Sequence, residues 1–286
     1  MNEPWTGYRR TLNGEMGPEL AEEFVGRLHD AAGGDPTRAT NFFFGLGQLW
    51  SPLVQAWSRW VETNSTARVA VVLRDAKPLL ARPTPSEWLR LHLNRLLCGV
   101  PDELSAHAGH AGHPLLAEYL DQRIGPDGEF TFADSGCYGT VLLQLHRQGI
   151  RPQPLFFFSK NPHVRGLLNE AGLSPEEGEL LNDSLECGFP HVCGRPSELV
   201  RGPDETIRVR PTSTDPLSVR FGEAALAGVR QAPPSALPVR EAAAALLSAA
   251  ERARRGEFTG LLGRTSPEWS GKENFLASWP TELHWT

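Results

Sequence analysis

Residues 130–158 read FTFADSGCYGTVLLQLHRQGIRPQPLFFF, and this stretch decides the fold class of the chain. Phe130–Ala133 is typical of a buried β-strand, and Val141–Gln148 has the apolar spacing of a helix that Gly149 ends. Pro154–Phe158 is a second apolar strand. A strand, a helix and a strand within about thirty residues predict a βαβ crossover, and therefore two parallel strands.

The segments on either side extend this α/β pattern. Apolar residues at three- and four-residue spacing predict helices over Pro18–Ala32, Asn41–Thr63, Ser86–Leu97, Pro114–Ile124 and Pro238–Arg255. Short apolar or β-branched runs predict strands over Arg68–Leu73, Thr206–Arg210 and Ser218–Phe221. The run RVAVVL at 68–73 is continuous, which is typical of a strand covered on both faces in a parallel sheet.

We therefore expect an α/β fold with a mainly parallel sheet flanked by helices, in a single domain over residues 1–286. Residues 1–65 form a helical N-terminal part, residues 66–225 the ligand-binding core, and residues 226–286 a C-terminal helix with an aromatic tail.

Composition excludes several classes of protein. The chain has 28 Lys and Arg against 34 Asp and Glu, a net charge of −6, which argues against a protein that coats nucleic acid. No window approaches the roughly 18 apolar residues of a membrane span. The N-terminus lacks the pattern of a signal peptide, and the four cysteines lack CxxC spacing. We expect a cytoplasmic protein with reduced thiols.

Two loops at the carboxyl ends of predicted strands carry the residues suited to chemistry, because parallel sheets bind ligands at that edge. In DSGCYGT, residues 134–140, Gly136 and Gly139 let the backbone approach a ligand, and the Thr140 hydroxyl adds a donor at a helix N-terminus. This pattern favours a phosphate site, although a tight chain reversal would also need the glycines. Asp134 would bind sugar hydroxyls or a divalent cation.

The second loop follows the strand at 68–73 and carries Arg74, Asp75 and Lys77. The arginine suits bidentate phosphate contact, while a surface ion pair is the alternative interpretation of Arg74 and Asp75. Further candidates for the same edge are Asn94, Arg95, Ser159 and Lys160.

Five segments together resemble a known family. GQLWSPLVQAWSRWV, VVLRDAKPLL, HLNRLL, FADSGCYGTVLLQL and SLECGFPH, in this order over about residues 45–200, are similar to a domain of bacterial polysaccharide-biosynthesis proteins that is often fused to a haloacid-dehalogenase-type phosphatase. Such domains resemble type I phosphoribosyltransferases, which have a Rossmann-like fold. The resemblance implies that 5-phosphoribosyl diphosphate (PRPP) is the donor and that Mg²⁺ neutralises its diphosphate.

The resemblance also assigns roles to residues. It implies that Asp134 binds the ribose hydroxyls, that Arg74, Asp75 and Lys77 form the diphosphate-side loop, and that the 5-phosphate is cradled by Ser135, Gly136, Cys137, Tyr138, Gly139 and Thr140. Asp75 and Asp134 are the candidate metal ligands, and they are candidate catalytic residues together with Glu186. Glu186 would act as a base, orient the acceptor or cap a helix. Two positions depart from the family pattern: Ser135 replaces a second carboxylate, and Ala76 replaces a glycine.

We therefore expect a pentosyltransferase that moves a 5-phosphoribosyl group from PRPP to a glycan or small-metabolite acceptor and releases diphosphate. The alternatives are a haloacid-dehalogenase-like phosphatase with Asp75 as nucleophile, acting on a sugar phosphate, and a catalytically inactive phosphosugar-binding scaffold. A homodimer and a separate phosphatase partner both remain open.

Overall fold

The computed structural model describes residues 3–16, 18–73, 76–82, 85, 88–98, 112–125, 129–190, 196–211, 214–254, 276 and 279. The chain groups into two compact units. We call Met1–Ala56, Glu176–Gly194 and Ser213–Ser266 the helical unit, and Trp57–Pro175, Arg195–Thr212 and Pro267–Thr286 the sheet unit. Two compact units need not be two independently folding domains, so the expectation of a single domain stays a prediction.

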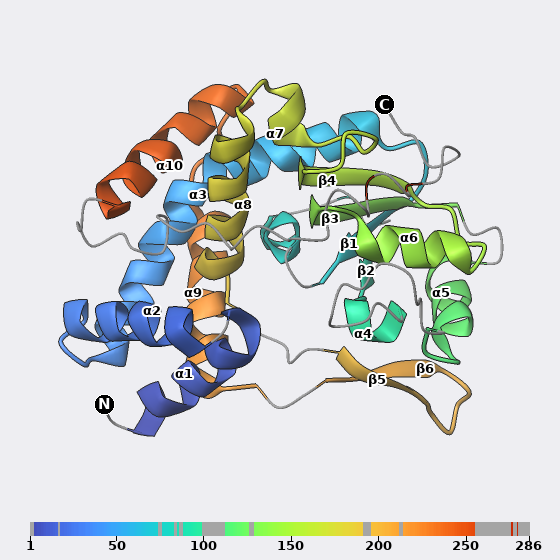
Figure 1. Ribbon diagram of the computed structural model, residues 1–286, viewed down its shortest axis with the longest axis horizontal. Helices are drawn as coiled ribbons and strands as arrows, with labels where there is room; N and C mark the ends of the chain where they lie inside the picture. Colours follow the sequence, from blue (N-terminus) through green and yellow to red (C-terminus); the bar gives the residue numbers. More distant parts are fainter. Residues whose placement is uncertain are drawn as a thin grey trace. The chain divides into compact units, whose positions relative to one another are not determined.

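The sheet unit is built on four parallel strands (Figure 1). They are β1 (Val69–Val72), β2 (Leu89–Leu91), β3 (Thr131–Cys137) and β4 (Gln153–Ser159), in the spatial order β2-β1-β3-β4. Val71 pairs with both Arg90 of β2 and Ala133 of β3, so β1 lies inside the sheet. The expected mixed α/β fold with a parallel sheet is confirmed.

Short helices flank this sheet. They are η1 (Lys77–Ala81), α4 (Arg95–Cys98), α5 (Leu116–Ile124), α6 (Thr140–Arg147) and α7 (Leu167–Glu170). Alternate residues of the strands, such as Ala70, Phe132 and Phe156, are buried in one apolar core with residues of α4, α5 and α6. On β4, Phe157 contacts Trp57, with ring centroids 4.9 Å apart. Apolar side chains on adjacent strand positions are therefore both buried, as the continuous apolar runs predict.

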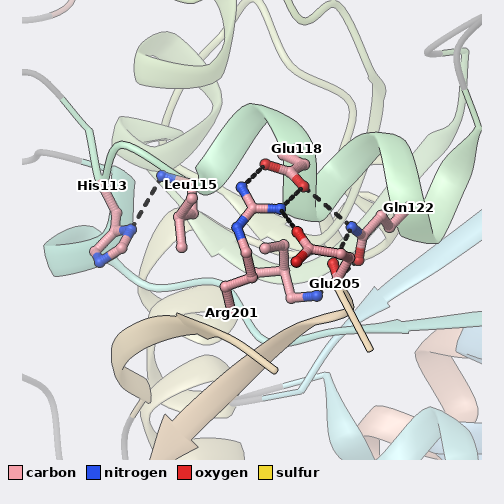
Figure 2. A network of polar contacts seen from close by, with 7 residues as sticks. His113, Leu115, Glu118, Gln122, Arg201 and Glu205 are labelled. Carbon is pink, nitrogen blue, oxygen red and sulfur yellow. Dashed lines mark hydrogen bonds and ion pairs between the residues drawn. The ribbon is translucent and has the colours of Figure 1, made fainter. Parts of the chain in front are cut away.

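An antiparallel hairpin of β5 (Pro196–Arg201) and β6 (Ile207–Pro211) is fastened to α5 by polar contacts (Figure 2). The Arg201 guanidinium donates to the Glu118 carboxylate, at 2.6 Å for one pair of atoms, and also to Glu205 at 3.0 Å. The Gln122 amide donates to the Glu205 carbonyl oxygen and accepts from the Ile207 N–H at 2.7 Å. This network holds both strands of the hairpin against a single helix face.

The helical unit consists of α1 (Glu3–Met16), α2 (Pro18–Ala31), the part of α3 (Pro36–Asn64) up to Ala56, α8 (Pro175–Gly188) from Glu176, α9 (Pro216–Gln231) and α10 (Val239–Arg254). Helices α3 and α9 approach so closely that a Cβ on Gly47 would lie 1.9 Å from the Ala225 carbonyl oxygen. A Cβ on Gly228 would lie 2.1 Å from the Phe44 carbonyl oxygen. Only glycines permit this helix crossing.

Two expected elements are wrong. Ser86–Leu97 is not one helix: within it the structure describes strand β2 and the beginning of α4. Ser218–Phe221 lies inside helix α9, which Asp215 caps by accepting the Ser218 N–H at 2.9 Å. The other expected helices and strands are confirmed, with ends that differ by up to five residues. Among the described helices, none is long and apolar enough to cross a membrane.

Candidate functional site

The order of the strands singles out one end of the sheet for ligand binding. This end is formed by the carboxyl ends of the strands, and we call it the carboxyl edge, or simply the edge, of the sheet. β1 and β3 are neighbours, but the connection that leaves β1 runs to β2 on one side and the connection that leaves β3 runs to β4 on the other. In open parallel sheets, ligands bind outside the carboxyl ends of the strands at such a switch point. Here that edge is formed where β1 ends at Val72 and β3 ends at Cys137.

β3 continues further into the glycine-rich segment than we expected. Gly136 pairs with Phe158 and Cys137 pairs with Ser159, so residues 134–137 belong to the strand and the turn is confined to Tyr138 and Gly139. Gly136 has φ +109°, and a Cβ there would lie 2.2 Å from the Phe158 carbonyl oxygen. The close approach of β4 therefore accounts for this glycine without any ligand.

The N-terminus of α6 begins directly after the turn. Gly139 adopts the left-handed conformation as N-cap, and its carbonyl oxygen accepts the first intrahelical hydrogen bond from the Leu143 N–H at 3.0 Å. The N–H groups of residues 140–142, at the start of the helix, have no acceptor within it, and the N-cap Gly139 has no side chain with which to bond them. Such an end attracts anions, and Thr140 adds a half-buried hydroxyl.

Asp134 and Ser135 differ in how accessible their side chains are to a ligand. Asp134 follows Ala133, the last β3 residue that pairs with β1, and its half-buried carboxylate accepts the Ser135 N–H at 2.9 Å. Ser135 is only 2% exposed. Asp134 is thus positioned for a ligand at the sheet edge, whereas Ser135 is part of the interior.

The end of β4 contributes one cation beside the turn. The Lys160 N–H donates to the Cys137 carbonyl oxygen at 3.1 Å, and its ammonium lies 5.6 Å from the centre of the Tyr138 ring. Ser159 is buried, and its hydroxyl donates to the Asn161 carbonyl oxygen at 2.9 Å. The Asn161 amide in turn donates to the Tyr138 carbonyl oxygen at 3.2 Å. Ser159 therefore helps to hold the two loops together, and Lys160 is the better candidate for a ligand contact.

Around Gly139, a side chain from the C-terminal part of the sheet unit closes one side of the turn. A Cβ on Gly139 would lie 3.2 Å from the ring of Trp279, which is itself buried. Tyr138 is buried as well, while Asp134, Gly136, Cys137 and Thr140 are half-buried. The turn is thus partly covered, and the half-buried residues are those that a ligand would reach.

The candidates near β1 and β2 are only partly described. Arg74 and Asp75 lie outside the described residues. Lys77 is the first residue of η1 and is half-buried, and Ala76 before it is fully buried. The Asn94 side chain accepts the Leu97 N–H at 2.8 Å and so caps α4, of which Arg95 is the first residue.

Glu186 lies on α8 in the helical unit, where its carboxylate accepts from the Asn182 amide at 3.3 Å. The sheet unit contains all the other described candidates. Among the described residues, no three His, Cys, Asp or Glu side chains gather as a metal-binding group.

Comparisons with protein-family models, curated proteins and solved structures found no match for this chain. The functional interpretation therefore starts from the geometry of the sheet edge.

One residue at this edge was missed. His92 follows β2 directly and is half-buried, and burial lowers its pKa, with further lowering by the positive charges of Arg123 and Lys77. Because we expected a helix over residues 86–97, nothing in that prediction placed His92 at a strand end.

Proposed function

We propose that the chain is a PRPP-dependent phosphoribosyltransferase that uses the edge formed by β1, β3 and β4. The observation that carries the proposal is that β3, at the switch point of a parallel sheet, holds the Asp134 carboxylate and leads through the Tyr138–Gly139 turn into the N-terminus of α6. A phosphorylated sugar needs both a site for its phosphate and an acceptor for its hydroxyls, and these two features supply them.

The 5-phosphate would lie at the N-terminus of α6. Thr140 begins α6 directly after the Tyr138–Gly139 turn, and the Lys160 ammonium lies 5.6 Å from the centre of the Tyr138 ring in that turn, so we assign both groups to one phosphate. This site is smaller than the cradle expected from the sequence. Ser135 is buried and Gly136 is accounted for by strand packing, so we assign neither of them to the phosphate.

Asp134 would accept hydrogen bonds from the ribose hydroxyls. Mg²⁺ is commonly held by one or two carboxylates together with substrate phosphates and water, so Asp134 and Asp75 suit an ion that arrives with the diphosphate. When bound, the ion would neutralise charge on the leaving group. The acceptor oxygen or nitrogen would form a bond to C1 of the ribose and lose its proton to solvent, while the bond from C1 to the diphosphate oxygen breaks and its electron pair leaves with the diphosphate. The protein contributes positioning and electrostatic stabilisation.

The first test is calorimetry with Mg²⁺–PRPP and with ribose 5-phosphate. We expect both to bind wild-type protein, and T140V to weaken both about 10- to 150-fold, the value of one charge-assisted hydrogen bond of about 1.5–3 kcal/mol. T63V is the matched control, because the Thr63 hydroxyl donates to the Arg59 carbonyl oxygen within α3. If neither ligand binds the wild type, the proposal is wrong.

Lys160 provides a second test of the phosphate site. K160Q removes one positive charge beside the turn and should weaken ribose 5-phosphate binding, more at low salt than at high salt, because salt screens charges that are partly exposed. An equal loss at all salt concentrations would point to a structural role for Lys160.

A phosphosugar-binding module without turnover is the second candidate. It is favoured by Ser135, which occupies the position of the family's second carboxylate and is buried. Tight binding of Mg²⁺–PRPP with no release of diphosphate under any acceptor tried would favour this module over the transferase.

A further inference from the structure

His92 lies where two neighbouring strands, β1 and β2, end. Leu91 is the last residue of β2 and pairs with Val72, the last residue of β1. The Leu73 N–H continues this ladder by donating to the Leu91 carbonyl oxygen at 2.8 Å. His92 comes directly after β2, and the chain that leaves β1 reaches Lys77 four residues after Leu73. Both residues therefore belong to the ligand-binding edge.

The main chain fixes the position of His92. β2 is an edge strand, and the His92 N–H donates to the Tyr119 hydroxyl oxygen at 3.0 Å. Tyr119 is fully buried on α5. Because the backbone makes this bond, a change of the His92 side chain leaves it in place.

The surroundings of the imidazole disfavour its charged form. Burial has the largest influence, followed by the positive charges of Arg123 on α5 and Lys77 on η1, and all three lower the pKa of His92. Tyr119, whose hydroxyl oxygen accepts the His92 backbone N–H, has a pKa raised by burial and is a neutral phenol. Among the described residues, no carboxylate contributes to the shift in the pKa of His92. An anion bound beside Lys77 would reverse this balance, since a nearby opposite charge favours a protonated imidazole.

We propose that His92 and Lys77 form the subsite for the diphosphate group of the donor, and that His92 takes up a proton from solvent when the diphosphate binds. This inference rests on the proposed function and adds a residue that the sequence did not indicate. The protonated imidazole then donates a charge-assisted hydrogen bond to a phosphoryl oxygen. On transfer, the same hydrogen bond remains with the departing diphosphate as its charge increases, so His92 acts on the leaving group.

Proton uptake on binding can be measured directly. Inorganic diphosphate and PRPP, each with Mg²⁺, are titrated calorimetrically into the full chain between pH 6 and 8, in buffers of different ionisation enthalpy. The protons that the ligand itself gains or loses are the same for every variant at one pH and one Mg²⁺ concentration, so they cancel in the difference between wild type and H92N. We expect the wild type to take up nearly one proton more than H92N does when diphosphate binds. The ratio of the wild-type affinity to the H92N affinity should then fall by up to about tenfold for each unit rise in pH.

The controls separate a local effect from a loss of structure. H163N changes another half-buried histidine, located after β4, and should bind diphosphate with the wild-type proton uptake. H92Q should behave as H92N does, and the urea midpoints of all variants should match that of the wild type.

Each outcome of the experiment decides a separate point. If PRPP binds and H92N keeps the wild-type proton uptake and affinity, His92 has no part in the subsite, while the proposed function stands. If diphosphate binds with uptake that depends on His92 but neither PRPP nor ribose 5-phosphate binds, the anion subsite stands and the transferase is wrong. Binding of none of the three ligands would overturn both.

Discussion

The crossing of α3 and α9 predicts that substituting alanine for two glycines of α3 has opposite effects on the stability of the chain. Gly45 and Gly47 are two residues apart in α3, and both are helical. A Cβ on Gly45 would meet nothing within 4 Å, whereas a Cβ on Gly47 would lie 1.9 Å from the Ala225 carbonyl oxygen and 2.8 Å from its carbon. We expect G45A to stabilise the chain and G47A to destabilise it.

The magnitudes follow from these contacts. Replacing an exposed helical glycine by alanine gains up to about 1 kcal/mol of helix propensity. Overpacking typically costs about 1–3 kcal/mol, and G47A belongs at the upper end because a backbone carbonyl cannot rotate away. Separating the helices would also stretch the hydrogen bond from the Ser51 hydroxyl to the Val229 carbonyl oxygen, 3.2 Å long and worth about 1 kcal/mol. After the gain in propensity is subtracted, G47A should destabilise by about 2–3 kcal/mol.

Urea unfolding followed by far-UV circular dichroism measures both variants. With a slope of about 3 kcal/mol per molar urea, G47A should lower the midpoint by about 0.7–1 M, and G45A should raise it by up to about 0.3 M. If G47A proves as stable as G45A, the helices do not approach at Gly47 and the packing described for the helical unit is wrong.

Three further outcomes test the sheet unit. G136A should lower the urea midpoint of the chain more than G149A does. Both glycines have positive φ, but of these two only Gly136 is placed so that a Cβ would meet a backbone oxygen. Equal losses of stability in the two variants would contradict the close approach of β4. The hydrogen bond from Arg201 lowers the pKa of Glu118, so the stability that this bond adds at neutral pH is lost as pH falls through the lowered pKa. The urea midpoints of wild type and E118Q should therefore differ at neutral pH and converge well below pH 4.5. A difference that stays constant with pH would show that the ion pair does not cause it. Burial raises the pKa of Cys98 to about 12, so iodoacetamide at pH 8 should label it only after unfolding, as mass spectrometry of the peptides would show.

The sequence predicts β1 and β4 well because both strands are continuously apolar in their interior. β1 and β4 have no polar residue between their first and last positions, which leaves few alternatives to a buried strand. β2 has three residues, and the leucines of WLRLHLNRLL fit both a two-residue and a four-residue repeat. Pairing with β1 decides between them, and no local pattern contains that information.

The wrong prediction of a strand at Ser218–Phe221 has a different origin, because the sequence before it does contain the pattern of a helix start. Asp215 followed by Pro216 is typical of a helix start, with aspartate as N-cap and proline at the first helical position. Considered alone, Ser218–Phe221 has enough apolar character to suggest a strand. The N-cap, together with the buried positions Phe221, Ala225 and Val229, favours the helix.

The glycine-rich segment shows why a motif alone overstates a site. Gly136 and Gly139 are equivalent in the pattern DSGCYGT, yet the first is required by β4 and only the second caps a helix end where an anion can bind. The distinction depends on how far β3 extends. Pairing with β4 over the last four residues of β3 determines that extent, and local sequence does not.

The edge of the sheet collects its polar groups from four separate segments. Lys77 follows β1, His92 follows β2, Asp134 is in β3 and Lys160 follows β4, so parallel pairing brings to one edge residues up to 83 positions apart in sequence. Two lysines and the N-terminus of α6 favour negative charge there, while the described strand ends contribute one carboxylate, Asp134. Neighbouring strands lie about 4.8 Å apart, so β2 and β3 are separated by about 10 Å across β1. A sugar that carries an anionic group at each end can span that distance, whereas a single phosphate cannot. The separation therefore supports the proposal of PRPP, rather than inorganic phosphate, as the ligand that would engage both the α6 end and the proposed subsite of His92 and Lys77.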